Sequence, residues 1–381
     1  MRNDLPTARQ RFFALGAGAL LAAVLLNIGA TGKKTSFDEL ALGEENKESY
    51  TTVGGYPIHG KNLDMFESIL KGYRQRQSRN VVLWLGNSQL HAINQAKANA
   101  TPAPAKLYAR FSDRDCDVIT LSQPNANLQE HYVLFEFLRQ RMNVRLLLLP
   151  VVFDDLRNTG VRFGLADALD DPAVIRELER TPVGMKIKPM AGDEVMFGGG
   201  DDFAGVRDTL QSRSERFLNE GLASTSKVWE SRSELRGRIF LGMYLLRNRA
   251  FGISSSSKRK MISGRYALNL EALAATLESA RSVGIPVLIY IVPLRADVET
   301  PYVLEEYSRF KEQVTALAAA LGSYFMNYED LVPAKYWGTM DDIQGDGQGV
   351  DFMHFQEAGH ELLADALELR VRKILDLEGQ D

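Results

Sequence analysis

Val81-Val-Leu-Trp-Leu-Gly86-Asn87-Ser88-Gln89-Leu90-His91 joins an apolar run to a short polar segment. The first five residues are bulky and partly β-branched, which predicts a buried strand. Gly86 can adopt backbone angles that other residues avoid, and a helix is expected from about Gln89. Ser88 would then lie at a strand-to-helix turn, where free amides stabilise negative charge that develops beside its hydroxyl. The alternative is that Asn87 or Ser88 only caps the helix.

The composition limits the classes of function. The chain has 381 residues, a net charge of -4 and a single cysteine, Cys116. This length suits one large domain, or a core domain with a sizeable insertion. The charge balance gives no electrostatic reason to expect nucleic acid. One cysteine excludes a disulfide within the chain and a zinc site built from cysteines. No spacing of carboxylates or histidines supports a metal site, and we expect no cofactor.

The amino-terminal segment predicts a membrane anchor. Arg2, Arg9 and Arg11 precede an uncharged stretch over residues 12–30, which at helical rise spans roughly 28 Å, about one hydrocarbon core. The basic flank should stay in the cytoplasm, so residues 1–32 would be a single-pass anchor in the inner membrane. The main domain would then be periplasmic. A cleaved signal peptide is the alternative, because Ile28-Gly-Ala30 resembles a small-residue cleavage site.

The rest of the chain alternates between expected strands and helices. Residues 33–60 are polar and weakly patterned, which predicts a tether, and residues 61–381 would form the main domain. Separated by expected helices, five apolar runs predict a five-stranded parallel sheet, and they cover residues 81–85, 117–121, 144–152, 286–292 and 323–328. Charged helical segments between about 156 and 264 predict an inserted helical cap. The class is therefore α/β.

Sites in such sheets lie at the carboxyl ends of the strands, where several polar residues occur. Ser88, Asn125, Asp154 and Arg295 each follow an expected strand. Asn125 comes after a proline, and asparagine tolerates left-handed backbone angles better than most residues. Arg295 either contacts an anionic substrate or pairs with a carboxylate, and the sequence leaves both open.

Asp351-Phe-Met-His354 precedes the last expected helix, which ends near Leu375. Asp and His at this spacing can point to one side. An aspartate that accepts from one imidazole nitrogen fixes the tautomer, and the other nitrogen is then free to take a serine proton. Capping of the helix by Asp351 explains the same residues.

Together these segments resemble the SGNH (GDSL-like) hydrolase superfamily. Gly86-Asn87-Ser88-Gln89 resembles its first block, with Asn where Asp is usual, and Asn125 falls where the second block has an oxyanion glycine. The Asp351–His354 segment resembles the last block. The resemblance implies a flavodoxin-like fold with Ser88 as nucleophile, His354 as general base and Asp351 orienting it. The Ser88 amide and Asn125 would stabilise the oxyanion, and we expect Asn87, Gln89 and Arg295 beside the substrate.

One departure from the superfamily indicates a particular branch. The third block of the superfamily carries Gly-x-Asn-Asp, and its Asn donates to the oxyanion. Here the segment is Pro150-Val-Val-Phe-Asp154-Asp155, without that Asn. With the anchor and the cap, this looks like the membrane-anchored branch of DltD-like proteins and polysaccharide O-acetylation accessory proteins.

That branch implies a cell-envelope O-acyltransferase. It would transfer acetyl to a surface polysaccharide or related polymer through a serine ester, beside a membrane-bound O-acyltransferase partner. Two alternatives remain open: a carbohydrate esterase of the same fold, and a non-catalytic protein that binds glycan or docks on the membrane acyltransferase.

Overall fold

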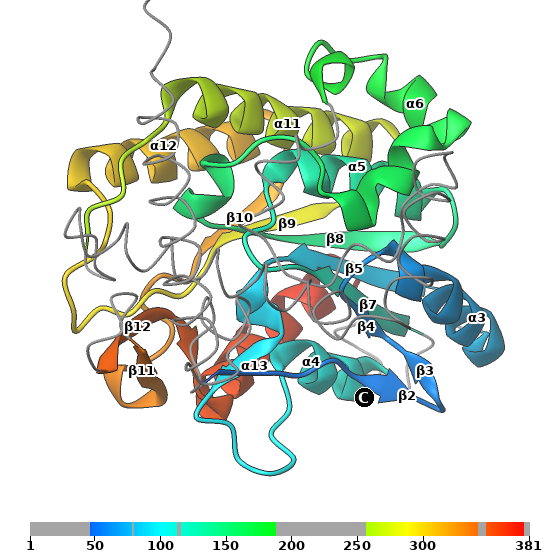
Figure 1. Cartoon of the computed structure of the whole chain (residues 1–381). Coiled ribbons are helices and arrows are strands. Elements are labelled where there is room, and N and C mark those ends of the chain that lie inside the picture. The colour runs from blue at the N-terminus through cyan, green and yellow to red at the C-terminus, as the bar shows by residue number, and fades with distance from the viewer. Residues whose placement is uncertain (1–45, 78–79, 113–115, 188–256, 342–347, 377–381) are drawn as a thin grey trace, which may run out of the picture.

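A computed structural model describes residues 46–77, 80–112, 116–187, 257–341 and 348–376. Figure 1 shows a three-layer α/β/α arrangement, with α5, α11 and α12 over one face of a central sheet and α4 and α13 over the other. The predicted anchor (1–32), the first part of the tether (33–45) and residues 188–256 of the predicted cap lie outside the described residues. Among the residues described, no helix is long and apolar enough to cross a membrane.

The elements alternate along the chain as a parallel α/β fold requires. The strands are β1 (Asn46–Glu48), β2 (Thr52–Val53), β3 (Tyr56–Pro57), β4 (His59–Gly60), β5 (Asn80–Gly86), β6 (Ala92–Asn94), β7 (Cys116–Ser122), β8 (Val144–Val151), β9 (Val287–Ile291), β10 (Tyr324–Asn327), β11 (Trp337–Asp341) and β12 (Gln348–Phe355). The helices are α3 (Phe66–Arg76), α4 (Ala103–Phe111), α5 (Leu128–Arg139), α6 (Pro172–Leu178), α11 (Ser263–Ser282), α12 (Leu304–Ala320) and α13 (Glu357–Ile374).

The main sheet is parallel throughout, in the order β10-β9-β8-β5-β7-β4. All five predicted strands are present, but the predicted number of strands is wrong because β4 adds a sixth. β4 has only two residues, His59 and Gly60, which pair with Thr120 and Leu121 of β7. A two-residue strand leaves no periodic pattern in the sequence. It exists because its backbone completes the hydrogen bonds of the β7 edge.

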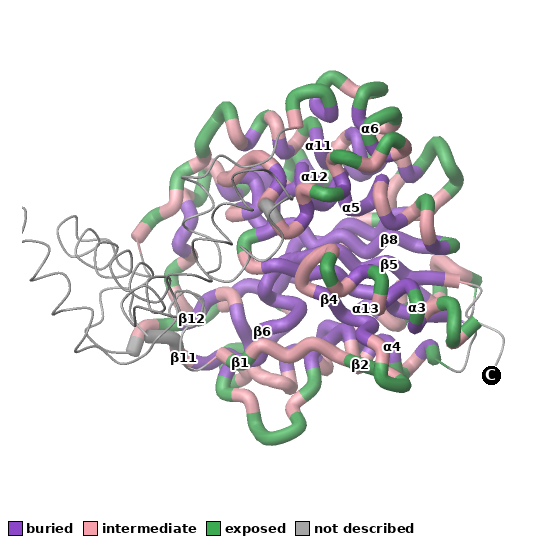
Figure 2. The backbone as a smooth tube through the Cα atoms, turned by 45° about the vertical axis from the view of Figure 1, so that its right-hand side comes forward, coloured by how far each residue is buried: buried purple, intermediate pink, exposed green. Residues whose placement is uncertain are grey.

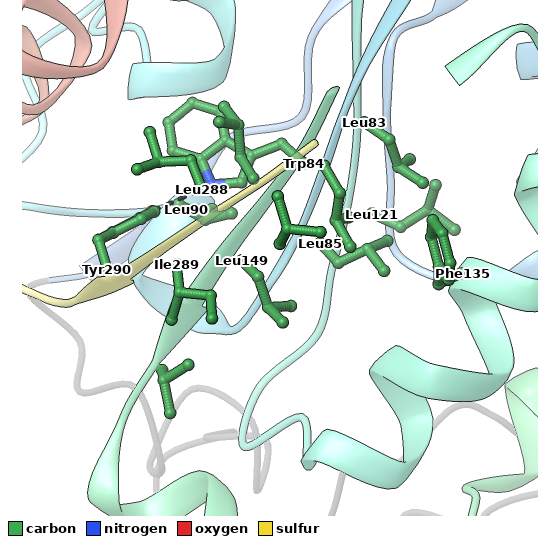
Figure 3. Close-up of a cluster of buried hydrophobic side chains, with 14 of the residues drawn as sticks. Leu83, Trp84, Leu85, Leu90, Leu121, Phe135, Leu149, Leu288, Ile289 and Tyr290 are labelled. Carbon is green, nitrogen blue, oxygen red and sulfur yellow. Dashed lines mark hydrogen bonds between the residues drawn. The ribbon is translucent and has the colours of Figure 1, made fainter. Parts of the chain in front are cut away.

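The centre of the sheet is apolar on both faces, as the long apolar runs predicted. Figure 2 shows that β5 and β8 are mostly buried, and the exceptions are Asn80 at the start of β5 and Arg145 near the start of β8. Trp84 is fully buried and reaches across β8, so that its indole N–H donates to the Tyr290 hydroxyl of β9 at 3.0 Å (Figure 3). Cys116 is buried at the first position of β7.

The described residues 46–60 differ from the predicted tether. β1 pairs antiparallel with β6, with Asn46 opposite Asn94, and β4 joins the main sheet. A tether would leave these backbone groups in water. Here non-local pairing orders them, and local sequence does not encode such pairing.

Part of the predicted cap lies within the described residues. After β8 the chain forms 3-10 turns and then α6, which packs against α5. The Asp171 side chain caps α6 by accepting from the amides of Ala173 and Val174. The chain is described again from residue 257, just before α11.

Candidate active site

Ser88 lies at the carboxyl end of β5, the central strand that the sequence singled out. The predicted helix after it is absent. Ser88–Leu90 form one 3-10 turn, capped by the Asn87 side chain, and the chain continues as β6. Each residue of β6 is buried and pairs with β1, and these contacts outweigh the local helical pattern. The backbone amide of Ser88 therefore acts as a single dipole, because no α-helix follows it.

Gly86 is required by packing at the end of β5. Its backbone is not in the left-handed region that the sequence argument invoked. A Cβ at this position would lie 2.5 Å from the Leu90 side chain and 3.0 Å from that of Pro150. Only glycine lets the Ser88 turn fold back this closely on β8.

Three side chains that are far apart in sequence meet at this turn. The Ser88 hydroxyl lies 2.9 Å from Nε2 of His354, and Nδ1 of the same imidazole lies 3.0 Å from Oδ2 of Asp351. Because the carboxylate accepts from Nδ1–H, Nε2 is left to accept the Ser88 proton. Asp351 is buried at 1% exposure, and Ser88 and His354 are nearly buried, at 8% and 7%.

Asp351 and His354 lie on β12, and the last helix follows directly, as the sequence predicted. α13 begins at Glu357, and β12 forms a hairpin with β11. Asp351 Oδ1 accepts from the amides of Met353 and His354, both at 2.9 Å. The aspartate thus holds a local turn of its own strand, as a capping residue would, while Oδ2 faces the imidazole.

The Asp351 carboxylate is held ionised. Burial alone would raise its pKa, but the charge of His354 and hydrogen bonds from His354 and Asn46 outweigh burial and lower the pKa to about 2. Two further amides reach Oδ2, from Asn46 at 2.8 Å and Asn94 at 3.2 Å. The sequence had no signal for either asparagine.

Asn125 lies in the turn after β7, at the same sheet edge as Ser88, since β7 and β5 are neighbours with Ser122 opposite Gly86. Its φ of 52° is left-handed, and its side chain is exposed. Arg162 donates to the carbonyls of Pro124 and Asn125 at 3.0 and 3.2 Å. The turn is therefore fixed by a residue that sequence reasoning did not single out.

Asn87 and Gln89 flank Ser88 but are committed to the scaffold. The side-chain Oδ1 of Asn87 accepts from the backbone amide of Gln89, and Nδ2 of Asn87 lies 3.3 Å from Oδ1 of Asp155. The Gln89 side chain donates to the carbonyls of Pro293 and Met353 at 2.9 and 2.8 Å. Gln89 thus ties the Ser88 turn to the end of β9 and to β12.

Arg295 contacts the β11–β12 pair, but its guanidinium is already paired with a carboxylate. It donates to the carboxylate of Asp297 at 2.8 and 3.0 Å and to the Gly338 carbonyl at 2.7 Å. Its backbone N–H donates to the Phe352 carbonyl, next to Asp351. Of the two alternatives that the sequence left open, the structure has the pairing with a carboxylate.

The segment after β8 places a buried carboxyl, Asp155, next to the Ser88 turn. Asp155 accepts from the Val152 amide at 3.0 Å and from Asn87. Burial raises its pKa well above the ordinary value, against the effect of these hydrogen bonds. Asp154, by contrast, pairs with Arg157 and Arg259 and accepts from the Tyr302 hydroxyl. Neither side chain supplies an oxyanion donor.

Histidines gather beside the site without forming a metal centre. His91 and His59 both contact the Ser122 hydroxyl, at 2.7 and 2.6 Å. Burial lowers the pKa of both imidazoles, to about 3 for His59, so both are neutral. His360 contacts the backbone of Ala103 and Ala92. Within the described ranges, no group of three or more potential ligands is arranged to hold a metal ion.

Comparison with known proteins found no matching family model and no matching curated protein. Three solved structures are similar. A protein of Agrobacterium tumefaciens assigned as an arylesterase is 13% identical, with 77% of this chain and 99% of that one covered and a TM-score of 0.34. A Bacteroides fragilis protein assigned as an acylhydrolase is 10% identical, covering 80% and 97%, with a TM-score of 0.36. The inhibitor-bound M. smegmatis aryl esterase is 14% identical, covering 77% and 99%, with a TM-score of 0.33. Similarity at this level does not define the family of this chain.

Proposed function

We propose that this protein is a serine-dependent acyl-transferring enzyme that forms an ester on Ser88. The observation that carries the proposal is the continuous chain from Asp351 through His354 to the Ser88 hydroxyl, with contacts of 3.0 and 2.9 Å. A buried carboxylate, an imidazole and a serine hydroxyl in this order are what nucleophilic catalysis by serine requires.

In the first half-reaction His354 Nε2 takes the Ser88 proton while Oγ attacks the carbonyl carbon of an ester. The ionised Asp351 stabilises the imidazolium that results. The Ser88 amide and the Asn125 turn are the donors that we assign to the oxyanion. His354 then returns the proton to the departing alkoxide, which leaves as an alcohol, and the acyl group remains on Ser88.

In the second half-reaction His354 removes a proton from the acceptor hydroxyl, which attacks the acyl-enzyme. Collapse of the intermediate regenerates the Ser88 hydroxyl. Water as acceptor gives an esterase, and a sugar hydroxyl gives an O-acyltransferase. The same residues serve both outcomes, so the acceptor is decided by what binds next to Ser88.

For the acceptor we propose a hydroxyl of a cell-envelope polysaccharide or related polymer, with acetyl as the group transferred. The support is the amino-terminal sequence, in which three arginines precede an uncharged stretch typical of a membrane anchor. An enzyme held on the periplasmic face of the inner membrane would meet envelope polymers there. It would also lie beside a membrane-bound O-acyltransferase able to supply acyl groups. A carbohydrate esterase is the second candidate, in which water takes the place of the sugar hydroxyl.

A serine-reactive fluorophosphonate probe tests the nucleophile. We expect the wild type to be labelled and Ser88→Ala to lose the label. The matched control is Ser122→Ala, because Ser122 also contacts histidines but is only 1% exposed and should not react. Label that persists in Ser88→Ala, or is lost in Ser122→Ala alone, would overturn the assignment. An unlabelled wild type would favour the non-catalytic alternative.

The acceptor is tested in cells that carry Ser88→Ala. A transferase predicts that their envelope polymer loses ester-linked acetyl groups. An esterase predicts the opposite, a gain of these groups over the wild type. Unchanged acyl content would contradict both forms of the proposal.

A further inference from the structure

Two asparagines from different strands converge on the carboxylate behind His354. β1 and β6 pair antiparallel, and Asn46 stands directly opposite Asn94. Side chains of directly opposed residues lie on the same face of such a pair, about 5 Å apart at Cβ. Their two amides are therefore placed side by side, facing β12.

Both amides donate to the same oxygen. Nδ2 of Asn46 lies 2.8 Å and Nδ2 of Asn94 3.2 Å from Oδ2 of Asp351, the oxygen that also accepts from His354. The other proton of the Asn94 amide goes to the Thr339 carbonyl of β11 at 2.9 Å. Asn94 is fully buried, so its orientation is set by β11 on one side and by Asp351 on the other.

This arrangement does more than satisfy a buried charge. The amides of Met353 and His354 already occupy Oδ1 and hold the carboxyl from its own strand. The asparagines donate to the other oxygen from two other strands, so a rotation of the carboxyl away from the imidazole would break hydrogen bonds to β1 and β6. Hydrogen bonds to an ionised group are the strong ones in proteins.

We propose that Asn46 and Asn94 are positioning residues that fix Asp351 on Nδ1 of His354, so that β1 completes the active site. The proposal rests on the proposed serine chemistry. Asn46 acts through Asp351, whose carboxylate lies between it and the imidazole. The amino-terminal strand, which the sequence assigned to a tether, is thereby part of the catalytic apparatus.

Asn46 is the better position to test, because it is only partly buried and a variant there should fold. Asn46→Ala removes one donor, and Asn46→Asp also places a second carboxylate against Oδ2. Measured on an ester substrate with the full-length protein, kcat should fall in the order wild type, Asn46→Ala, Asn46→Asp. The loss expected is about tenfold for the first and about a hundredfold for the second, the range for a hydrogen bond to a charged group. KM should stay within about twofold, since substrate binding does not involve Asn46.

A second measurement does not depend on turnover. The Nδ1–H proton of His354 should give a downfield 1H resonance, identified by its absence in His354→Gln, and both Asn46 variants should shift it. The matched control is Lys47→Ala, on the same strand with an exposed side chain. It should change neither kcat nor the resonance.

The outcomes separate the two proposals. If Asn46→Asp keeps kcat within twofold and leaves the resonance in place, the positioning role is overturned. It is also overturned if Lys47→Ala loses as much activity, because the effect would then belong to the strand as a whole. If the resonance moves as expected but the wild type neither turns over esters nor labels on Ser88, the positioning role stands and the proposed function fails.

Discussion

Arg162 pairs with Glu130, a fully buried carboxylate next to the Asn125 turn. Its guanidinium donates to Glu130 at 2.7 and 2.9 Å, and Glu130 in turn caps α5 by accepting from the Asn127 amide at 3.0 Å. The same guanidinium holds the carbonyls of Pro124 and Asn125. One side chain therefore fixes both the start of α5 and the turn that we assign to the oxyanion.

Arg162→Met should destabilise the protein by about 3 kcal/mol, because it leaves a buried carboxylate without its charge partner. It should also lower kcat by freeing the Asn125 turn. Urea denaturation and ester turnover measure the two effects. The control is Arg180→Met, which breaks an exposed pair with Glu177 and should change stability little, as exposed pairs contribute little. Equal stability changes in the two variants would contradict this account of Arg162.

At the scale of elements, the β11–β12 hairpin packs closely against β6. A Cβ on Gly338 would lie 1.6 Å from Oδ1 of Asn94, so the hairpin can approach only because this residue is glycine. Gly338→Ala should push β11 away from Asn94 and loosen Asp351. We expect a loss of 1–3 kcal/mol in stability, the usual cost of overpacking, and a fall in kcat.

Thermal unfolding and initial rates measure these effects, and Gly264→Ala is the matched control. Gly264 lies in α11 with open space around its Cβ position, so alanine there should be neutral or slightly stabilising. If Gly338→Ala were as stable and active as the wild type, the close packing of β11 on Asn94 would be irrelevant to the site.

The elements differ in how far the sequence predicted them. β5 and β8 are long apolar runs, and a run of apolar residues is itself the sequence signal of a strand buried on both faces, so the sequence located both strands. β4, β6 and β1 are two or three residues long and exist through pairing with distant segments, which leaves no local period. For the same reason Ser88, Asp351 and His354 were found by motif, whereas Asn46, Asn94 and Arg162 were missed. Their importance comes from contacts across 32 to 305 residues of sequence.

The whole molecule carries several imidazoles that are buried in the neutral form. Burial lowers the pKa of His59 and His360 to about 3 and that of His131 to about 4, and it lowers that of His91 as well. In the unfolded chain these groups titrate near 6.5. Below pH 6.5 the unfolded state therefore binds protons that the folded state does not, and stability falls as the pH falls.

His59, His131 and His360 should each contribute a slope of about 1.4 kcal/mol per pH unit, between pH 6.5 and a folded pKa of about 3 to 4. Asp351, with its pKa lowered to about 2, adds a loss below about pH 4, whereas the raised pKa of Asp155 acts in the opposite direction. Urea unfolding at pH 7, 6 and 5 should show a steep decline. In His131→Gln the decline per pH unit should be smaller by about 1.4 kcal/mol, the contribution of one titrating group. A free energy of unfolding that does not change over this range would contradict the buried neutral state.

The thiol of Cys116 at the start of β7 has one more consequence. It is the sole cysteine of the chain and it is closed off inside the sheet, so the fold contains no bond that an oxidant must make or a reductant can break. The covalent structure is therefore the same in a reducing cytoplasm and in an oxidising envelope. Protein recovered from either compartment should therefore carry Cys116 as the same free thiol.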